Sequence, residues 1–484
     1  MSGVGAKRRG KYIGLACGSF LAVAPGWGQT TASWVLPVDG FWSDATKWST
    51  NPVFPNNGSP LPSDSYEARI TAAGNVFSVS VVTNVNVTRV ILDSPDATLL
   101  VHSGGTLAVS NVLSVQHGTL QLKTGGAIKQ SRIEVGLSGS FQVPSLTGGR
   151  LDAVELAGLL ELGKSTAFLE VYNGLRLDGG TIGLHANSMF FDGTQTISGT
   201  GEITFDDNFG SNGVLVTDTG GTLTIGSGIV IRGATGGGQI SSGVIAPSAI
   251  VNQGTITVAG GSFNSIQILN GRTGFFSNTG LLEAKDDAML GVGGTFTTAG
   301  LGNFAASNGG IVAVMGGTLN NSGATLTLDS AARSLGVGSG GRIVGGTIAG
   351  SGGGKLVARS LNNPVAPGVL DGVTILTDID LMPRSELHLV NATPLAGATI
   401  RDALRRDGRQ HYSTRAGWLR HGDGDRNNCD GGGFWERDHY RGEWHRGPRP
   451  KHDTPRGRWS GPDQQPDREP RIDSREAFPS GFKC

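Results

Sequence analysis

The feature that most constrains the fold is a long series of short apolar alternations, each opened by glycine, from about residue 90 to residue 390. Typical units are GGTLAV at 104–109, GGTLTI at 220–225 and GTITV at 254–258. Each unit predicts a brief strand with one buried and one solvent-facing side, entered through a residue that can adopt positive φ. Because one such strand cannot bury enough apolar surface alone, we expect the units to stack in parallel as a β-solenoid.

The composition agrees with this architecture. The chain has 484 residues and 80 glycines, without a Gly-X-Y period, and its many Val, Ile and Leu residues argue against plain disorder. We predict an all-β fold, a single-stranded parallel β-helix of about 12 to 15 coils with roughly 20 to 25 residues each. The apolar positions expected to point inward are Leu107, Leu120, Ile182, Leu223, Ile256, Leu319 and Ile348.

Asparagine recurs beside the predicted turns. The positions are Asn252, Asn278, Asn320 and Asn321. An asparagine amide can cap the backbone of a turn and stack on an equivalent residue one coil away. We therefore expect these side chains to form part of a ladder.

Four segments are predicted along the chain: a signal peptide (1–28), an aromatic cap (29–74), the β-solenoid (75–395) and a disordered tail (396–484). Basic residues at positions 7, 8, 9 and 11 precede an apolar run at 12–24, which a secretory signal peptide requires. This run is too short to span a bilayer, so we expect no integral membrane segment in the mature chain. A twin-arginine signal at Arg8-Arg9 and a lipoprotein signal at Cys17 are weaker alternatives.

The cap is predicted from a concentration of bulky aromatics that differs from everything after it. These residues are Trp34, Phe41, Trp42, Trp48, Phe54 and Tyr66. A repeat stack needs an atypical terminal unit to cover its first open coil, and aromatics do this well. An alternative is that the tryptophans form a platform on which sugars stack.

The segment GFWSDATKWS at 40–49, followed by PNNG at 55–58 and DSYEA at 64–68, resembles the opening of a known class of proteins. These are large secreted repeat proteins of environmental bacteria, which begin with a G-x-W-x-x-x-x-x-W segment and continue into autotransporter-associated, β-helical G-T-L repeats. The resemblance covers about residues 34 to 395 and implies a surface or matrix component with no catalytic residues. From the sequence we expect no C-terminal outer-membrane barrel of the kind that true autotransporters carry.

Candidate catalytic residues are few. Asp206 and Asp207 follow an expected strand, and Asp286 and Asp287 form a second pair. A polysaccharide-cleaving β-helix needs an acid and a base about 5 to 10 Å apart, whereas adjacent strand residues point to opposite faces. We therefore interpret both pairs as solvated turn aspartates, with an ion site as a further alternative. The motifs QHG at 116–118 and SRI at 131–133 only approach those of pectin-cleaving enzymes.

No cofactor or metal site is predicted. The three cysteines are Cys17, Cys429 and Cys484, so neither a disulfide nor a cysteine metal site supports the body. Nearly half of the 39 lysines and arginines lie after residue 400. The body is thus sparsely charged and not suited to nucleic acid.

The tail after residue 400 changes composition abruptly to Arg, Asp, His, Trp, Pro and Gly. It could be a basic, anion-binding, disordered extension, and a metal site could be assembled from its histidines and Cys429. We favour a third interpretation, in which a frameshift has produced out-of-frame translation.

Together these features predict a bacterial protein that is secreted or displayed on the cell surface. We expect a structural or adhesive, non-enzymatic role in which the solenoid acts as a spacer or as a surface that binds extracellular polysaccharide or cell-surface components. The alternative is a polysaccharide-degrading glycosidase or lyase on the same fold, with Asp206 or Asp207 as its acid or base.

Overall fold

The computed structural model describes residues 28–205, 213–217, 220–233, 236–243, 246–261, 264–359, 366–383, 385–391, 394–396, 398–402 and 418–420. The predicted signal peptide, apart from Gly28, lies outside the described residues. Most of the predicted disordered and frameshifted tail, including Cys429 and Cys484, also lies outside them.

The described residues are mainly β-strand, with 62% in strands and 3% in helices. The N-terminal strands are β1 (Thr30–Ser33), β2 (Gly40–Phe41), β3 (Tyr66–Ile70), β4 (Phe77–Val81), β5 (Asn84–Val101), β6 (Thr106–Leu122), β7 (Ala127–Lys129), β8 (Arg132–Val143), β9 (Gly148–Ala157), β10 (Leu159–Leu162), β11 (Phe168–Gly183) and β12 (Ser188–Phe191). The central strands are β13 (Gln195–Phe205), β14 (Gly213–Thr217), β15 (Gly221–Ile225), β16 (Gly228–Gly233), β17 (Gly238–Ser242), β18 (Ser248–Asn252), β19 (Thr255–Val258), β20 (Ser265–Ile268), β21 (Gly274–Asn278), β22 (Leu281–Lys285), β23 (Met289–Thr297) and β24 (Asn303–Ser307). The C-terminal strands are β25 (Ile311–Asn320), β26 (Thr325–Leu328), β27 (Leu335–Gly338), β28 (Arg342–Val344), β29 (Thr347–Gly350), β30 (Leu356–Ala358), β31 (Gly368–Asp371), β32 (Thr374–Leu376), β33 (Ile379–Leu381), β34 (Glu386–Val390), β35 (Ile400–Asp402) and β36 (Trp418–Arg420). Within the part of the chain that the structure describes, helical structure is limited to α1 (Thr298–Leu301) and two 3-10 turns, η1 (Ala45–Lys47) and η2 (Ala331–Arg333).

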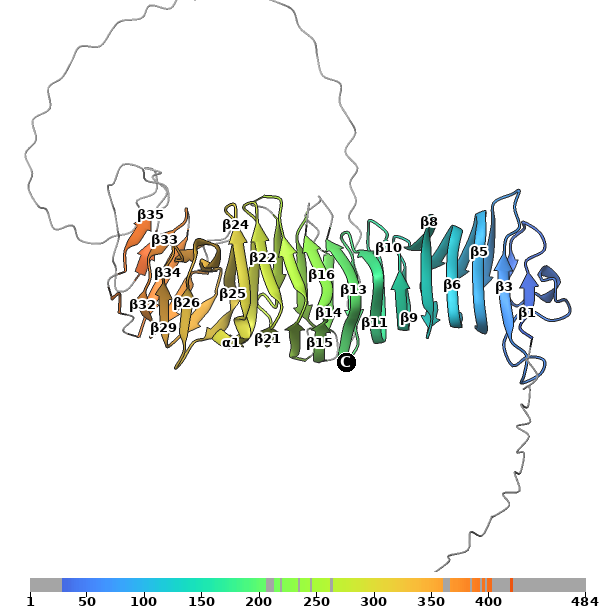
Figure 1. Cartoon of the computed structure of the whole chain (residues 1–484), viewed down its shortest axis with the longest axis horizontal. Helices are drawn as coiled ribbons and strands as arrows, with labels where there is room; N and C mark the ends of the chain where they lie inside the picture. Colours follow the sequence, from blue (N-terminus) through green and yellow to red (C-terminus); the bar gives the residue numbers. More distant parts are fainter. Residues whose placement is uncertain are drawn as a thin grey trace, which may run out of the picture. The chain divides into compact units, whose positions relative to one another are not determined.

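Each coil of the solenoid contributes to three stacked faces, which β6 shows within one strand. Its residues 106–109, 112–115 and 119–122 pair in parallel with three successive parts of β5, and we call the three faces first, second and third in that order. The same pairing continues from coil to coil (Figure 1). The structure is therefore the predicted parallel β-solenoid, with about 14 turns.

The core follows from the alternation in the sequence. Along most of β5 and on the first and third faces of β6, buried side chains alternate with more exposed ones, whereas all four residues of β6 on the second face, 112–115, are buried. All seven leucines and isoleucines predicted to point inward are completely buried. Each such side chain contributes roughly 1.5 to 3 kcal/mol when it leaves water. Val76 directly precedes β4 and is 85% exposed.

Glycine opens the coils because the preceding coil leaves no room for a side chain. At Gly105, a Cβ atom would lie 2.1 Å from the carbonyl oxygen of Val81. At Gly346, φ is +66° and a Cβ atom would lie 1.9 Å from the carbonyl oxygen of Asn321. The turns thus require glycine for close approach as well as for backbone conformation.

Three of the four predicted asparagines form buried contacts between coils. The amide of Asn252 donates to Oδ1 of Asn278 at 2.8 Å, and Asn278 in turn donates to the carbonyls of Leu301 and Asn303. Asn321 donates to two carbonyls of the next coil. Asn320 caps the backbone of its own turn, as predicted, by accepting from the N–H of Ser322, but its side chain is exposed, so the prediction that it joins the buried ladder is wrong.

An aromatic cluster lies at the N-terminal end, as predicted. Trp34, Trp42 and Trp48 are at most 2% exposed, and the ring of Trp48 lies 4.8 Å from that of Trp42 and 5.1 Å from that of Trp34. Strand pairing continues across residue 74. β1 pairs in parallel with β3, and β3 with β5, so the cluster is built onto the first coil.

The ladder also passes the predicted end of the solenoid at residue 395. β35 pairs in parallel with β33, and the described strand β36 pairs in antiparallel fashion with β34. Residues 400–402 and 418–420 are therefore strands within the segment predicted to be disordered. The alternation of Ile400 with its neighbours continues the apolar pattern, and its side chain packs against the core.

Candidate functional site

The predicted catalytic candidates Asp206 and Asp207 lie outside the described residues, directly after β13. The second pair is described. Asp286 and Asp287 form an exposed turn between β22 and β23, with φ values of 54° and 62°. Asp286 accepts a hydrogen bond from Asn308 at 3.0 Å, and the backbone carbonyl of Asp287 accepts one from Arg359 at 3.2 Å. This geometry is that of a turn stabilised by Asn308 from the next coil and by Arg359 from three coils away.

The motifs compared with pectin-cleaving enzymes do not come together. The ring of His117 lies 2.6 Å from the carboxylate of Asp93 in the preceding coil, and both side chains are exposed. Arg132 belongs to a different group of contacts, on the second face.

The most extensive polar cluster in the described part of the chain is a ladder of charges on the outside of the second face. In order along the stack, its aligned positions are Glu67, Arg89, Val112, Arg132, Glu155 and Arg176. Glu155 contacts the guanidinium groups of both neighbouring coils, at 3.1 Å in the case of Arg176. Opposite charges on adjacent strands stabilise the stack, whereas like charges would weaken it.

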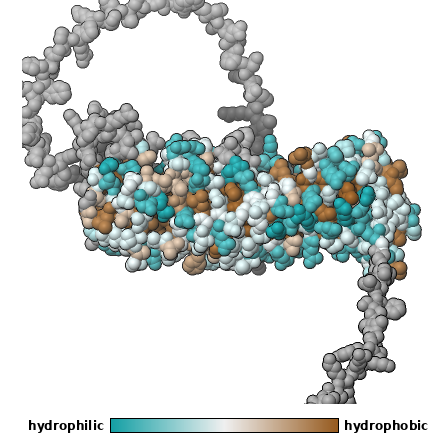
Figure 2. All heavy atoms as spheres, in the orientation of Figure 1, coloured by the Kyte–Doolittle hydropathy of each residue, from teal (hydrophilic) through white to brown (hydrophobic). Residues whose placement is uncertain are grey.

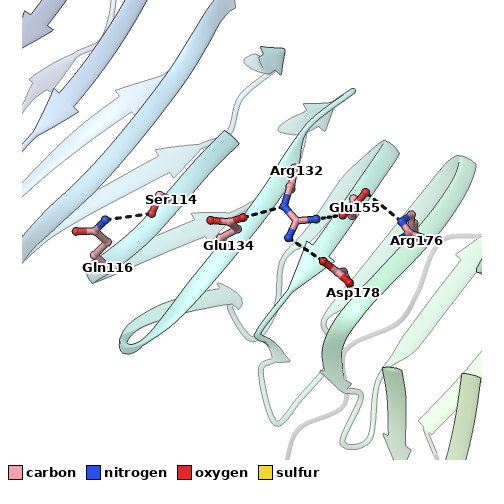
Figure 3. Close-up of polar contacts among 7 residues, drawn as sticks. All are labelled: Ser114, Gln116, Arg132, Glu134, Glu155, Arg176 and Asp178. Carbon is pink, nitrogen blue, oxygen red and sulfur yellow. Dashed lines mark hydrogen bonds and ion pairs between the residues drawn. The ribbon is translucent and has the colours of Figure 1, made fainter. Parts of the chain in front are cut away.

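Arg132 is the centre of this ladder (Figure 3). It donates to Glu134 at 2.8 Å, to Asp178 at 2.7 Å and to Glu155, so it joins three successive coils. The hydrogen bond to Glu134, followed by that to Asp178, raises the pKa of the guanidinium above its usual value. The Arg132 side chain is 35% exposed, so each ion pair contributes about 1 kcal/mol or less to stability. The ladder links successive coils.

The sequence analysis mentioned Arg132 but did not predict this network. The signal was the sequence separation between partners, which is 23 residues from Arg132 to Glu155 and 21 from Glu155 to Arg176. Both values are close to one coil. Opposite charges repeated at the coil length could therefore have identified the ladder.

A second feature is a groove of about 450 Å³ on the first face, formed by four successive coils. It is lined by Gly104, Thr106, Thr124, Gly125, Gly126, Ala127, Lys129, Gly148, Gly149, Arg150, Phe168 and Glu170. The sequence analysis named none of its side chains as a site, because they come together only through the register of the coils.

The described residues contain no group of three or more His, Cys, Asp or Glu side chains placed to hold a metal ion. Among these same residues, no helix has the length and apolar character needed to cross a membrane.

In the orientation of Figure 2, hydrophilic residues gather over the N-terminal half of the solenoid and alternate with apolar ones.

Comparison with known proteins adds no identification. No protein-family model matches the chain, and searches of curated proteins and solved structures gave no significant match.

Proposed function

We propose that this chain is an exported structural or adhesive protein of a bacterial cell surface or extracellular matrix. Its solenoid acts as a spacer and as a binding surface, and it performs no catalysis. Extracellular polysaccharide and other surface components are the partners. The resemblance to secreted autotransporter-associated repeat proteins, through the tryptophan-rich opening and the G-T-L repeats, supports this proposal.

The observation that carries the proposal is that carboxylates on the outside of the solenoid form ion pairs between coils. On the second face, Glu155 and Asp178 from the next two coils contact Arg132, so these carboxylates link coils to one another. A glycosidase instead needs one carboxyl that stays protonated and a second that stays ionised, both directed at a substrate. The ladder favours a rod held together from outside as well as inside.

The enzyme hypothesis can be tested directly. The purified full-length chain is incubated with a panel of acidic and neutral polysaccharides, and reducing ends and unsaturated products are measured. We expect no products. Turnover that is lost in Asp207→Asn would overturn the structural proposal and assign the chain to the polysaccharide-degrading class.

Export is tested separately by fractionating the producing bacterium and probing each fraction with an antibody against the solenoid. We expect the protein in the medium or on the cell surface, with residues at the start of the chain removed. A full-length product confined to the cytosol would contradict the proposal.

A further inference from the structure

The groove on the first face has a floor of small residues and a wall at one end. Gly104, Gly125 and Ala127 leave the backbone of two coils open on the outside of the sheet. At the next coils, Arg150 aligns with Ala127, and Glu170 aligns with Arg150. Large side chains therefore replace small ones at the same register positions, which creates a step along the stack.

Phe168 forms the apolar part of this step. It aligns with Gly148 of the preceding coil, where a Cβ atom would lie only 2.0 Å from its Cζ. The absence of a side chain at Gly148 thus lets the ring lie back over the preceding coil, toward the groove. Phe190 contacts Phe168 edge to face, with ring centroids 6.4 Å apart, and holds the ring in place. The Phe168 side chain stays partly exposed.

Arg150 forms the polar part. Its guanidinium lies 4.2 Å from the ring centroid of Tyr172 and donates to Glu170 at 3.3 Å. These contacts fix a planar group with five N–H donors at the edge of the groove, and they use only its Nε and one Nη. Partial burial, followed by the charge of Glu170, raises the pKa of Tyr172, which therefore keeps its hydroxyl proton.

The charges around the groove balance. Lys129 lies 3.6 Å from Asp152, and Arg150 pairs with Glu170, which gives two cations and two carboxylates. A ligand with a large net charge therefore gains little electrostatic binding free energy at this surface. A ligand with many hydroxyl groups can accept from the guanidinium and donate to the carboxylates at once.

We propose that this groove binds a segment of a neutral polysaccharide, with one sugar ring against Phe168 and its hydroxyls on Arg150 and Glu170. A pyranose ring has an apolar C–H face that suits an aromatic ring and a rim of hydroxyls that suits paired charged groups. The glycines beside it let neighbouring sugar units approach the backbone. This assignment rests on the proposed adhesive function and names its ligand class and contact residues.

The test is affinity electrophoresis of the full-length chain in native gels that contain dextran, laminarin, xylan or polygalacturonate. We expect at least one neutral polysaccharide to retard the protein more strongly than the acidic polygalacturonate does. Phe168→Ala and Arg150→Ala should each weaken the apparent affinity about tenfold or more. Arg176→Ala removes a similarly exposed, carboxylate-paired arginine from the second face, so we expect it to bind as the wild type does.

Two further variants separate binding from folding. Phe168→Tyr keeps the ring and should keep the retardation, whereas Phe168→Leu keeps an apolar side chain and should lose it, with unchanged circular dichroism in both. Retardation that survives in Phe168→Leu and Arg150→Ala would refute the groove assignment and leave the adhesive function standing. Lack of retardation by every neutral polysaccharide, or stronger retardation by polygalacturonate, would also refute it. Products released from any gel polysaccharide would instead refute the non-enzymatic function.

Discussion

Asn278 offers the sharpest test of how the coils are held together. Its side chain is 2% exposed and accepts from Asn252 at 2.8 Å, while its own amide donates to the carbonyls of Leu301 and Asn303 at 2.9 and 2.8 Å. Asn278→Ala removes three hydrogen bonds, two buried and one partly buried, and leaves two carbonyls without these donors. At about 1 kcal/mol for each bond, we expect a loss of about 3 kcal/mol in the free energy of unfolding.

The matched control is Asn320→Ala. That side chain is exposed and makes a local turn contact with Ser322, so its removal should cost about 0.5 kcal/mol or less. Both variants are compared with the wild type by urea denaturation followed by far-UV circular dichroism. Because repeat stacks can open in sections, amide hydrogen exchange in β18, β21 and β24 shows whether the loss is local. Equal stability of the two variants would refute the asparagine ladder as a stabilising element.

A third variant, Asn278→Asp, tests the direction of the hydrogen bonds. It keeps an acceptor toward Asn252 but turns an oxygen toward the carbonyls of Leu301 and Asn303. Only a protonated carboxyl can donate there, so folding raises the pKa of the introduced group above its unfolded value of about 4. The stability of this variant relative to the wild type should therefore be greatest below that pH and fall as the pH rises. A stability difference from the wild type that becomes more favourable with rising pH would contradict the assigned orientation.

Three further predictions concern the cap, the charge ladder and the C-terminal coils. Trp48→Ala should cost about 3 to 5 kcal/mol in urea denaturation because the ring is fully buried; a loss below 1 kcal/mol would contradict its structural role. Arg132→Gln should cost about 1 kcal/mol and less in high salt, whereas Leu113→Ala, inside the same face, should cost about 2 to 5 kcal/mol at any salt concentration. Arg342 donates to Asp371, and this hydrogen bond is the largest cause that lowers the pKa of the Asp371 carboxyl. The ionised Asp371 therefore stabilises the fold above its unfolded pKa, and this stabilisation is lost as the pH falls through its folded pKa. In Arg342→Gln the Asp371 pKa, followed by NMR, should rise toward its ordinary value. An unchanged pKa would show that Arg342 does not lower it.

The parts of the fold that depend on local pattern could be predicted from the sequence. Alternation with period two determines which side of a strand is buried, so Leu107 and Ile348 were placed correctly although they lie at opposite ends of the stack. Glycine at the turns was equally informative because the close approach at Gly105 leaves no room for any side chain. These constraints act within one coil or on its immediate neighbour.

The parts that depend on register could not be predicted in the same way. Asn320 and Asn321 are adjacent and identical in type, yet only Asn321 is buried, and a shift of one residue would exchange them. The groove depends on Phe168 lying opposite Gly148, which follows from coil lengths that vary along the chain. Composition marks the aromatic cluster but does not reveal that β1 pairs with β3 and β3 with β5.

The central claim, that the chain gains its stability and its surfaces by stacking coil on coil, can be measured with pairs of spin labels on the third face. Thr119 and Glu202 are four coils apart along the register, and Thr119 and Thr255 are six coils apart. With the native cysteines replaced, electron–electron double resonance should give backbone separations of about 19 and about 29 Å, an increase of about 4.8 Å for each coil. Distances that do not grow in proportion to the number of coils would contradict the solenoid and everything inferred from it.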